Sequence, residues 1–185
     1  MKKSIFLVAA FCGMALLSSC GGTTQSVVQA DQEVFVPCSG PEFMTNNEYI
    51  RASAMGLSTD MNMAKKKALA SARTDIASAI ETRVRSVIDE YGSSYQNGEN
   101  EEAKSRYQQM SRSSINQSLR GLRTICEKTM KTPDGKYKVY VTLELAGEQL
   151  LEDMAQNIKA DDKLRVDFEY EKFKKIFEEE MANYK

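Results

Sequence analysis

A long stretch of helical periodicity constrains the fold of this chain more than any other feature of its sequence. Between residues 60 and 91, apolar side chains recur at steps of three and four, which is the period of one helix face. They are Met61, Ala64, Ala68, Ala72, Ile76, Ile80, Val84, Val87 and Tyr91, with Leu69 and Ile88 beside them. Ser58 or Thr59 can cap such a helix, and Gly92 can end it.

A segment with the period of a β-strand precedes this helix. Residues 49–56 alternate, so that Ile50, Ala52, Ala54 and Gly56 share one face. The small residues on this face match the alanines in the first half of the helix. We therefore expect the strand to lie directly against that half.

The clearest local signal is a β-hairpin. Two strand-like runs, 122–132 and 137–146, are joined by Pro133-Asp134-Gly135-Lys136. Proline presets φ and Asp-Gly tolerates positive φ, so these residues suit a tight turn. The second run alternates between a set that we expect to be buried and a set that we expect to face water. The first set is Tyr137, Val139, Val141, Leu143 and Leu145, and the second is Lys138, Tyr140, Thr142 and Glu144.

Helices are expected in the rest of the chain. One should cover residues 99–119, one should begin at Gly147, and the last should begin near Lys163. The predicted order is β-α-α-β-β-α-α. This order is typical of an α+β fold, in which a small antiparallel sheet of about three strands packs against helices. We place this domain at residues 48–160 and treat residues 161–185 as an amphipathic, aromatic-rich C-terminal helix.

The first nineteen residues have the organisation of an export signal. Lys2 and Lys3 precede an apolar run over residues 5–17, which is shorter than the roughly 18–20 apolar residues that span a bilayer. Leu17-Ser18-Ser19-Cys20 follows and resembles the lipobox of bacterial lipoproteins, whose cysteine is acylated before cleavage. We expect residues 1–19 to be removed. Acylated Cys20 would then hold the chain stably at a lipid bilayer.

The segment after Cys20 has the composition of a linker. Residues 21–47 are rich in Gly, Thr, Ser, Gln and Asn and contain two prolines. Such a composition is typical of a flexible tether, which we place at residues 20–47 together with the lipidated cysteine. Gly21, rather than an acidic residue, follows Cys20, which the resemblance to bacterial lipoproteins makes compatible with sorting to the outer membrane.

Three segments resemble a known family. They are Tyr49-Ile50-Arg51-Ala52-Ser53-Ala54-Met55-Gly56, then Ala64-x-x-x-Ala68-x-x-x-Ala72-Arg73-x-Asp75-Ile76-Ala77-x-x-Ile80, and Tyr140-Val141-Thr142-Leu143-Glu144. Together with the lipobox, they are similar to the small bacterial lipoproteins named for a twenty-kilodalton outer-membrane lipoprotein. The resemblance covers residues 49–154. It implies an exported, membrane-anchored domain without known catalytic residues, at the periplasmic face or the cell surface.

The composition argues against an enzyme and against nucleic-acid binding. The chain has no histidine, which removes Ser-His and Cys-His nucleophile activation and the zinc sites that use histidine. Lys2 and Lys3 leave with the signal, so the 25 basic residues become 23, against 26 acidic ones. Nucleic-acid binding needs clustered positive charge. We expect no cofactor, no metal and no catalytic residue.

The cysteines leave one question open. Cys12 is removed with the signal and Cys20 is modified, so Cys38 and Cys126 remain. Disulfides persist in exported proteins, and a Cys38–Cys126 bridge would join the tether to the folded domain. The alternative is two buried free thiols that pack as small hydrophobic groups.

Two groups of charged residues could carry chemistry or binding. Glu144, Glu148, Glu152 and Asp153 are close in sequence, but we expect them on water-facing surfaces rather than in the desolvated pair that acid–base catalysis needs. The run Lys65–Lys67 could contact anionic headgroups or an acidic partner. A solvated helix face explains the run as well, and we favour that interpretation.

Two functional hypotheses remain. The leading one is a non-enzymatic structural or interaction module of the cell envelope that binds a protein or a second copy of itself. The candidate partner-binding residues are on the C-terminal helix, where packing on the chain's own sheet is the other explanation; they are Phe168, Tyr170, Phe173, Phe177 and Met181. The alternative is a ligand- or glycan-binding, peptidoglycan-associated module that uses Lys138, Tyr140 and Thr142.

Overall fold

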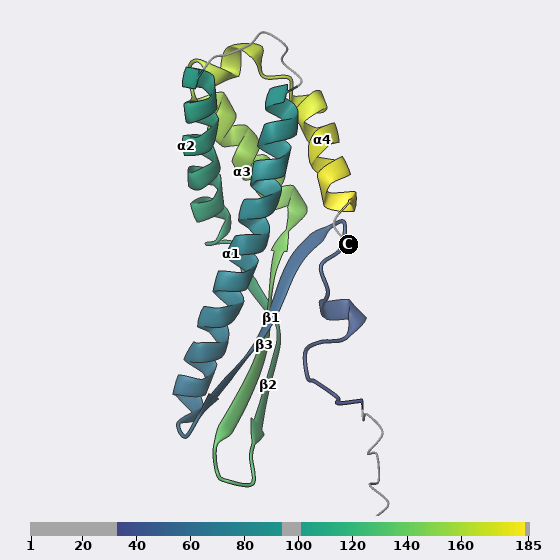
Figure 1. The fold of residues 1–185 in the computed structure, drawn as a ribbon, viewed down its shortest axis with the longest axis vertical. Coiled ribbons are helices and arrows are strands. Elements are labelled where there is room, and N and C mark those ends of the chain that lie inside the picture. Colours follow the sequence, from purple (N-terminus) through teal and green to yellow (C-terminus); the bar gives the residue numbers. More distant parts are fainter. Residues whose placement is uncertain (1–32, 94–100, 184–185) are drawn as a thin grey trace, which may run out of the picture. The chain divides into compact units, whose positions relative to one another are not determined.

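The computed structural model describes residues 33–93 and 101–183. The chain divides into two units, Met1–Val34 and Phe35–Lys185. All helices and strands of the described residues belong to the second unit (Figure 1).

The second unit has the predicted α+β fold, with a three-stranded antiparallel sheet and helices in the predicted order. The elements are β1 (Tyr49–Ser58), α1 (Met61–Ser93), α2 (Glu101–Ser118), β2 (Arg123–Lys131), β3 (Tyr137–Ala146), α3 (Gly147–Ala160) and α4 (Tyr170–Ala182), with short 3-10 helices at Pro41–Phe43 and Leu164–Asp167.

The last helix begins later than the sequence predicts, at Tyr170 rather than near Lys163. The Asp161 side chain accepts hydrogen bonds from the backbone N–H groups of Lys163 and Leu164, at 3.0 and 3.1 Å. These bonds stabilise a turn followed by a 3-10 helix, so the chain changes direction before α4 starts.

The strand order is β1-β3-β2, and β3 pairs antiparallel with both neighbours. Tyr49 of β1 lies opposite Ala146, and Ser58 lies opposite Tyr137. Because neighbouring residues point to opposite faces of a strand, the sheet has one face toward α1 and one face away from it. The second is called the open face below.

The first half of α1 lies unusually close to β1. Ala64, Ala68 and Ala72 are fully buried, as the sequence predicts. A Cβ atom placed on Gly56 would lie only 2.0 Å from the Ala64 carbonyl oxygen and 2.6 Å from the Ala68 nitrogen. The helix backbone therefore occupies the space that any side chain at this position would need. Met61, which the predicted stripe includes, is exposed.

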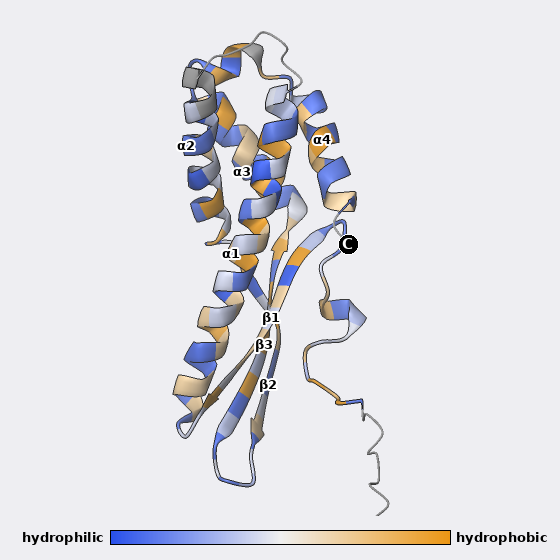
Figure 2. Ribbon diagram, viewed as in Figure 1, coloured by the Kyte–Doolittle hydropathy of each residue, from blue (hydrophilic) through white to orange (hydrophobic). Residues whose placement is uncertain are grey.

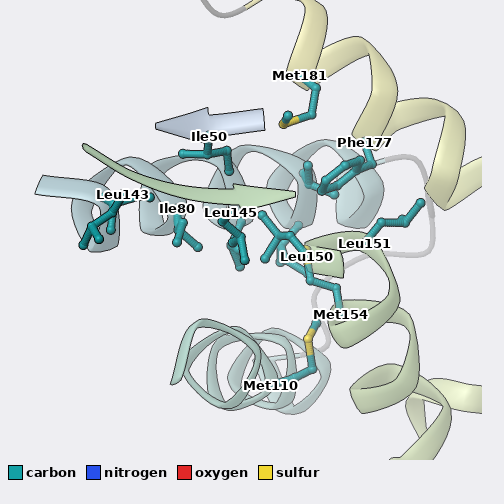
Figure 3. Packing of buried hydrophobic residues seen from close by; sticks show 14 of the residues in the cluster. Ile50, Ile80, Met110, Leu143, Leu145, Leu150, Leu151, Met154, Phe177 and Met181 are labelled. Carbon is teal, nitrogen blue, oxygen red and sulfur yellow. The ribbon is translucent and has the colours of Figure 1, made fainter. Parts of the chain in front are cut away.

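The second half of α1 packs with α2, α4 and the end of the sheet in one hydrophobic core. Figure 3 shows Phe177 and Met181 turned from α4 toward the strands, with Met181 on the side of Ile50. The hydropathy colouring in Figure 2 shows apolar residues in bands along α1, between hydrophilic ones. Burying each large apolar side chain of this core stabilises the fold by roughly 1.5–3 kcal/mol.

Part of the predicted tether is packed on the open face of the sheet. Cys38 forms a disulfide with Cys126 of β2, with their Cα atoms 5.7 Å apart. The Cys38 carbonyl oxygen accepts a hydrogen bond from Thr142 Oγ1 at 3.0 Å and lies 2.9 Å from Ser53 Oγ. The tether prediction is therefore wrong for residues 37–45, because the bridge and these bonds join this segment to the sheet. We call residues 37–45 the strap.

The open face is also less exposed than the alternation of β3 predicts. Thr142 is fully buried, and Glu144 is only 4% exposed. Arg51 and Arg123, from the two outer strands, pair with the two oxygens of Glu144 at 2.7 and 2.5 Å. Arg51 also donates to the carbonyl oxygen of Met44 in the strap. Expecting both residues to face water was wrong, because the strap and the arginines cover them.

Replacing Gly56 tests the close contact of α1 with β1. We expect Gly56→Ala to lower the free energy of unfolding by about 1–3 kcal/mol, because the new methyl group meets helix backbone that cannot move independently. Gly92→Ala is the matched control, since nothing lies within 4 Å of its added Cβ. The control should be neutral or stabilise by up to about 1 kcal/mol. Equal effects in denaturant unfolding would contradict the contact.

Removing the disulfide tests the strap. We expect the double variant Cys38→Ser/Cys126→Ser to lose about 2–4 kcal/mol of unfolding free energy, since the bridge closes a long loop of 88 residues. Reducing the wild-type protein should give the same loss. An unchanged denaturant midpoint in both experiments would show that the strap is held without the bridge.

Candidate functional site: a groove beside the C-terminal helix

The second unit contains a groove between the start of β1, the start of α3 and the helix α4. Its volume is about 570 Å³. Buried apolar side chains form its base, from Leu151, Phe177 and Met181. Its other lining residues include four glutamates, which are Glu48, Glu148, Glu152 and Glu178.

A glycine at the junction of β3 and α3 sets the base of the groove. Gly147 begins α3 directly after β3, and its N–H donates to the Glu48 carbonyl oxygen at 2.7 Å. A Cβ atom at this position would lie 2.9 Å from Met181 Cε. Glycine therefore allows α4 to approach the junction and to place Met181 against it.

The charges lining the groove are mostly negative. Lys174 is the one basic residue among the described residues that line it. Tyr170 donates a hydrogen bond from its hydroxyl group to Glu152 Oε1 at 2.8 Å. This bond is the main reason that the pKa of Tyr170 is raised above its usual value. The ammonium group of Lys159 lies 4.8 Å from the centre of the Tyr170 ring, on the side of α3.

The five candidate partner-binding residues of the C-terminal segment differ in how deeply they are buried. Phe173 is fully buried, with its ring centre 5.2 Å from that of Tyr91 in α1. Phe177 and Met181 are 4% and 2% exposed. Of the two explanations for these three residues, the structure supports packing in the chain's own core, because their apolar area is already buried there. Phe168 and Tyr170 remain half-buried, and Tyr170 lines the groove.

The carboxylates that are close in sequence have different surroundings in the structure. Glu144 lies between two arginines on the open face. Asp153 is buried against α2, where it accepts hydrogen bonds from Ser118 Oγ at 2.7 Å and Gln117 Nε2 at 2.9 Å. Only Glu148 and Glu152 reach the groove. Each carboxylate thus has its own local role.

The described residues, 33–93 and 101–183, also show whether the unit has a metal-binding group or a membrane-spanning helix. No group of three or more histidine, cysteine, aspartate or glutamate side chains there is arranged to hold a metal ion. None of the helices in these ranges has the length and apolar character needed to cross a membrane.

The groove itself could not be found from the sequence. Its lining comes from three segments around residues 47–49, 146–152 and 170–182. Glu48 and Lys174 carry no local signal, because each belongs to a polar stretch that suits any solvated surface. The one available hint was Gly147, a glycine placed directly between a strand and a helix.

A scan of the chain against protein-family models finds no match, and a search of curated proteins finds no match either. The lipoprotein family to which the sequence is similar therefore stays a prediction.

The Tyr170–Glu152 hydrogen bond makes a testable prediction about pH. Because the folded protein raises the pKa of Tyr170, the bond contributes stability below the ordinary tyrosine pKa of about 10 and loses it as the pH rises further. The difference in ultraviolet absorbance between wild type and Tyr170→Phe should show this tyrosine ionising above pH 10. Glu152→Gln should move the midpoint down. A wild-type midpoint at or below pH 10 would contradict the bond.

Proposed function

We propose that the chain is a cell-envelope lipoprotein, anchored to the outer membrane by acylated Cys20, that acts as a non-enzymatic interaction module. Its groove binds a segment of an envelope protein that carries positive charge. The groove, with its apolar base and its glutamates, is the observation that carries this proposal.

Two features support the anchor. The lipobox resemblance of residues 17–20 follows an export signal, and the Cys38–Cys126 disulfide suits an oxidising compartment outside the cytoplasm. The bridge is also well placed mechanically. Since Cys38 is bonded covalently to β2, a pull on the chain from Cys20 reaches the sheet through a disulfide rather than through hydrogen bonds alone.

The chemistry of the groove supports a basic partner segment. Its volume is in the range of pockets that hold a small ligand or a few side chains. Lysine and arginine combine an apolar stem with a charged head. Such a side chain can lay its stem along the half-buried Tyr170, which lines the groove, and place its head among the glutamates. A binding role also agrees with a chain that lacks histidine.

The glycan-binding alternative has less support. It relied on Lys138, Tyr140 and Thr142 on the open face. Thr142 is buried beneath the strap, where its hydroxyl group already bonds to Cys38. The two remaining side chains, Lys138 and Tyr140, do not line the groove described above.

The anchor is tested by metabolic labelling with an alkyne fatty acid. Wild-type protein should carry the label and remain with the membrane fraction, whereas Cys20→Ala should lose the label. A Cys12→Ala variant is the control, and we expect it to be labelled normally because Cys12 belongs to the signal. Label retained by Cys20→Ala, or absent from the wild type, would contradict acylation at this residue.

The binding role is tested by photo-crosslinking in cells from Glu178, at the groove, in the full-length protein. A discrete crosslinked protein should appear, and Glu48→Gln/Glu148→Gln should reduce its yield several-fold. Crosslinking from Arg112, an exposed residue of α2, is the matched control and should not give this product. The same product from both positions, or none from Glu178, would contradict binding at the groove.

A further inference from the structure

Charge is distributed unevenly between two regions of the second unit. The end formed by residues 54–70 and 127–140 contains seven lysines and three acidic residues. It comprises the end of β1, the start of α1 and the β2–β3 hairpin (Figure 1), and we call it the basic end. Residues 147–183, which include the helices beside the groove, contain eleven acidic and six basic residues.

Each of the three acidic residues of the basic end bonds to a group within the basic end itself. Asp60 accepts a hydrogen bond from the Met63 N–H at the start of α1, at 2.8 Å. Glu127 pairs with Lys65 at 2.9 Å, and Asp134 pairs with Lys136 at 2.8 Å.

Three lysines of the basic end carry charge that nothing nearby neutralises. The structure records no ion pair for Lys66, Lys128 or Lys138 with any other residue that it describes. Lys128 and Lys138 lie on the open face, where the register places Lys128 opposite Tyr140 and Lys138 opposite Leu57. Their positive charge is therefore available to an external anion.

Exposed apolar side chains accompany these lysines. Ten large apolar residues of the described chain are exposed, and five of them belong to the basic end, at 39–48% exposure. They are Met55, Leu57, Met61, Met63 and Met130. Four of the five are methionines, whose flexible side chains adapt to irregular apolar surroundings. Positive charge next to exposed apolar groups is characteristic of surfaces that bind at the membrane interface.

We infer that the basic end docks onto the anionic headgroups of the membrane in which the acylated Cys20 is inserted, an inference that rests on the proposed anchor. The 15 residues from Cys20 to Phe35 reach at most about 50 Å, so the anchor keeps this surface at high local concentration near the bilayer. Lysines within a Debye length of anionic lipids are attracted to them.

A lipid surface fits the basic end better than an acidic protein does. The surface consists of a hairpin and a helix start, and its charges are lysines, which bind as point charges without the fixed geometry of arginine. A fluid layer of headgroups needs no matching shape. Docking in this way also orients the groove, because β1 extends about 30 Å from Ser58 in the basic end to Tyr49 at the groove. The groove then faces away from the bilayer, toward soluble partners.

Vesicle binding without the acyl chains tests this docking. The probe is mature chain with Cys20→Ser, sedimented with phosphatidylcholine vesicles that contain or lack phosphatidylglycerol. We expect binding to the anionic vesicles only, decreasing as the salt concentration rises. Lys66→Gln/Lys128→Gln/Lys138→Gln should weaken it by at least about tenfold. The control Lys159→Gln/Arg165→Gln/Lys175→Gln removes the same charge elsewhere and should change it by less than about twofold.

The possible results separate the explanations. Equal weakening by both triple variants would overturn docking by the basic end in favour of net charge. Binding to soluble polyglutamate as tight as to anionic vesicles would overturn it in favour of an acidic protein. Circular dichroism on each variant excludes unfolding as the cause of a loss. Because the probe lacks acyl chains, absence of vesicle binding would contradict the docking without affecting the proposed anchor. Absence of the fatty-acid label at Cys20 would contradict the anchor.

Discussion

The contact between Gly56 and α1 is the constraint on which the rest of the unit depends. The helix backbone at Ala64 and Ala68 lies where a side chain on residue 56 would stand. This close approach keeps the first half of α1 on the sheet, so its second half extends past the strands. The extension provides the surface on which α2 and α4 pack. The position of α4, and with it one wall of the groove, follows from this contact.

The open face of the sheet is organised by a second set of interactions. The strap is held by a disulfide to β2 and by hydrogen bonds from the hydroxyl groups of β1 and β3. Beside it, Glu144 accepts Arg51 and Arg123, so one carboxylate joins three strands. Burying charges is costly unless they are paired, and here both oxygens of the carboxylate have a partner. The part of the open face around Thr142 and Glu144 is therefore shielded from water.

The two ends of the unit differ in the chemistry they present. At the basic end, unneutralised lysines and exposed methionines suit an anionic surface. At the other end of β1, glutamates surround an apolar groove. These two ends are the basis of the arrangement that we propose, in which one end docks at a membrane and the groove at the other binds a partner. The strap connects this arrangement covalently to the chain that leads to Cys20.

The sequence by itself determined the order of elements, the α+β class and the close packing of β1 on α1. These depend on local periodicity, turn residues and small side chains, which neighbouring residues reveal. It left the Cys38–Cys126 bridge open, and it misjudged Thr142, Glu144 and residues 37–45. Only the tertiary structure decided these, together with the burial of Phe173 and the existence of the groove. The physical reason is that burial and pairing depend on which distant segments cover a residue, and alternation along a strand does not carry that information.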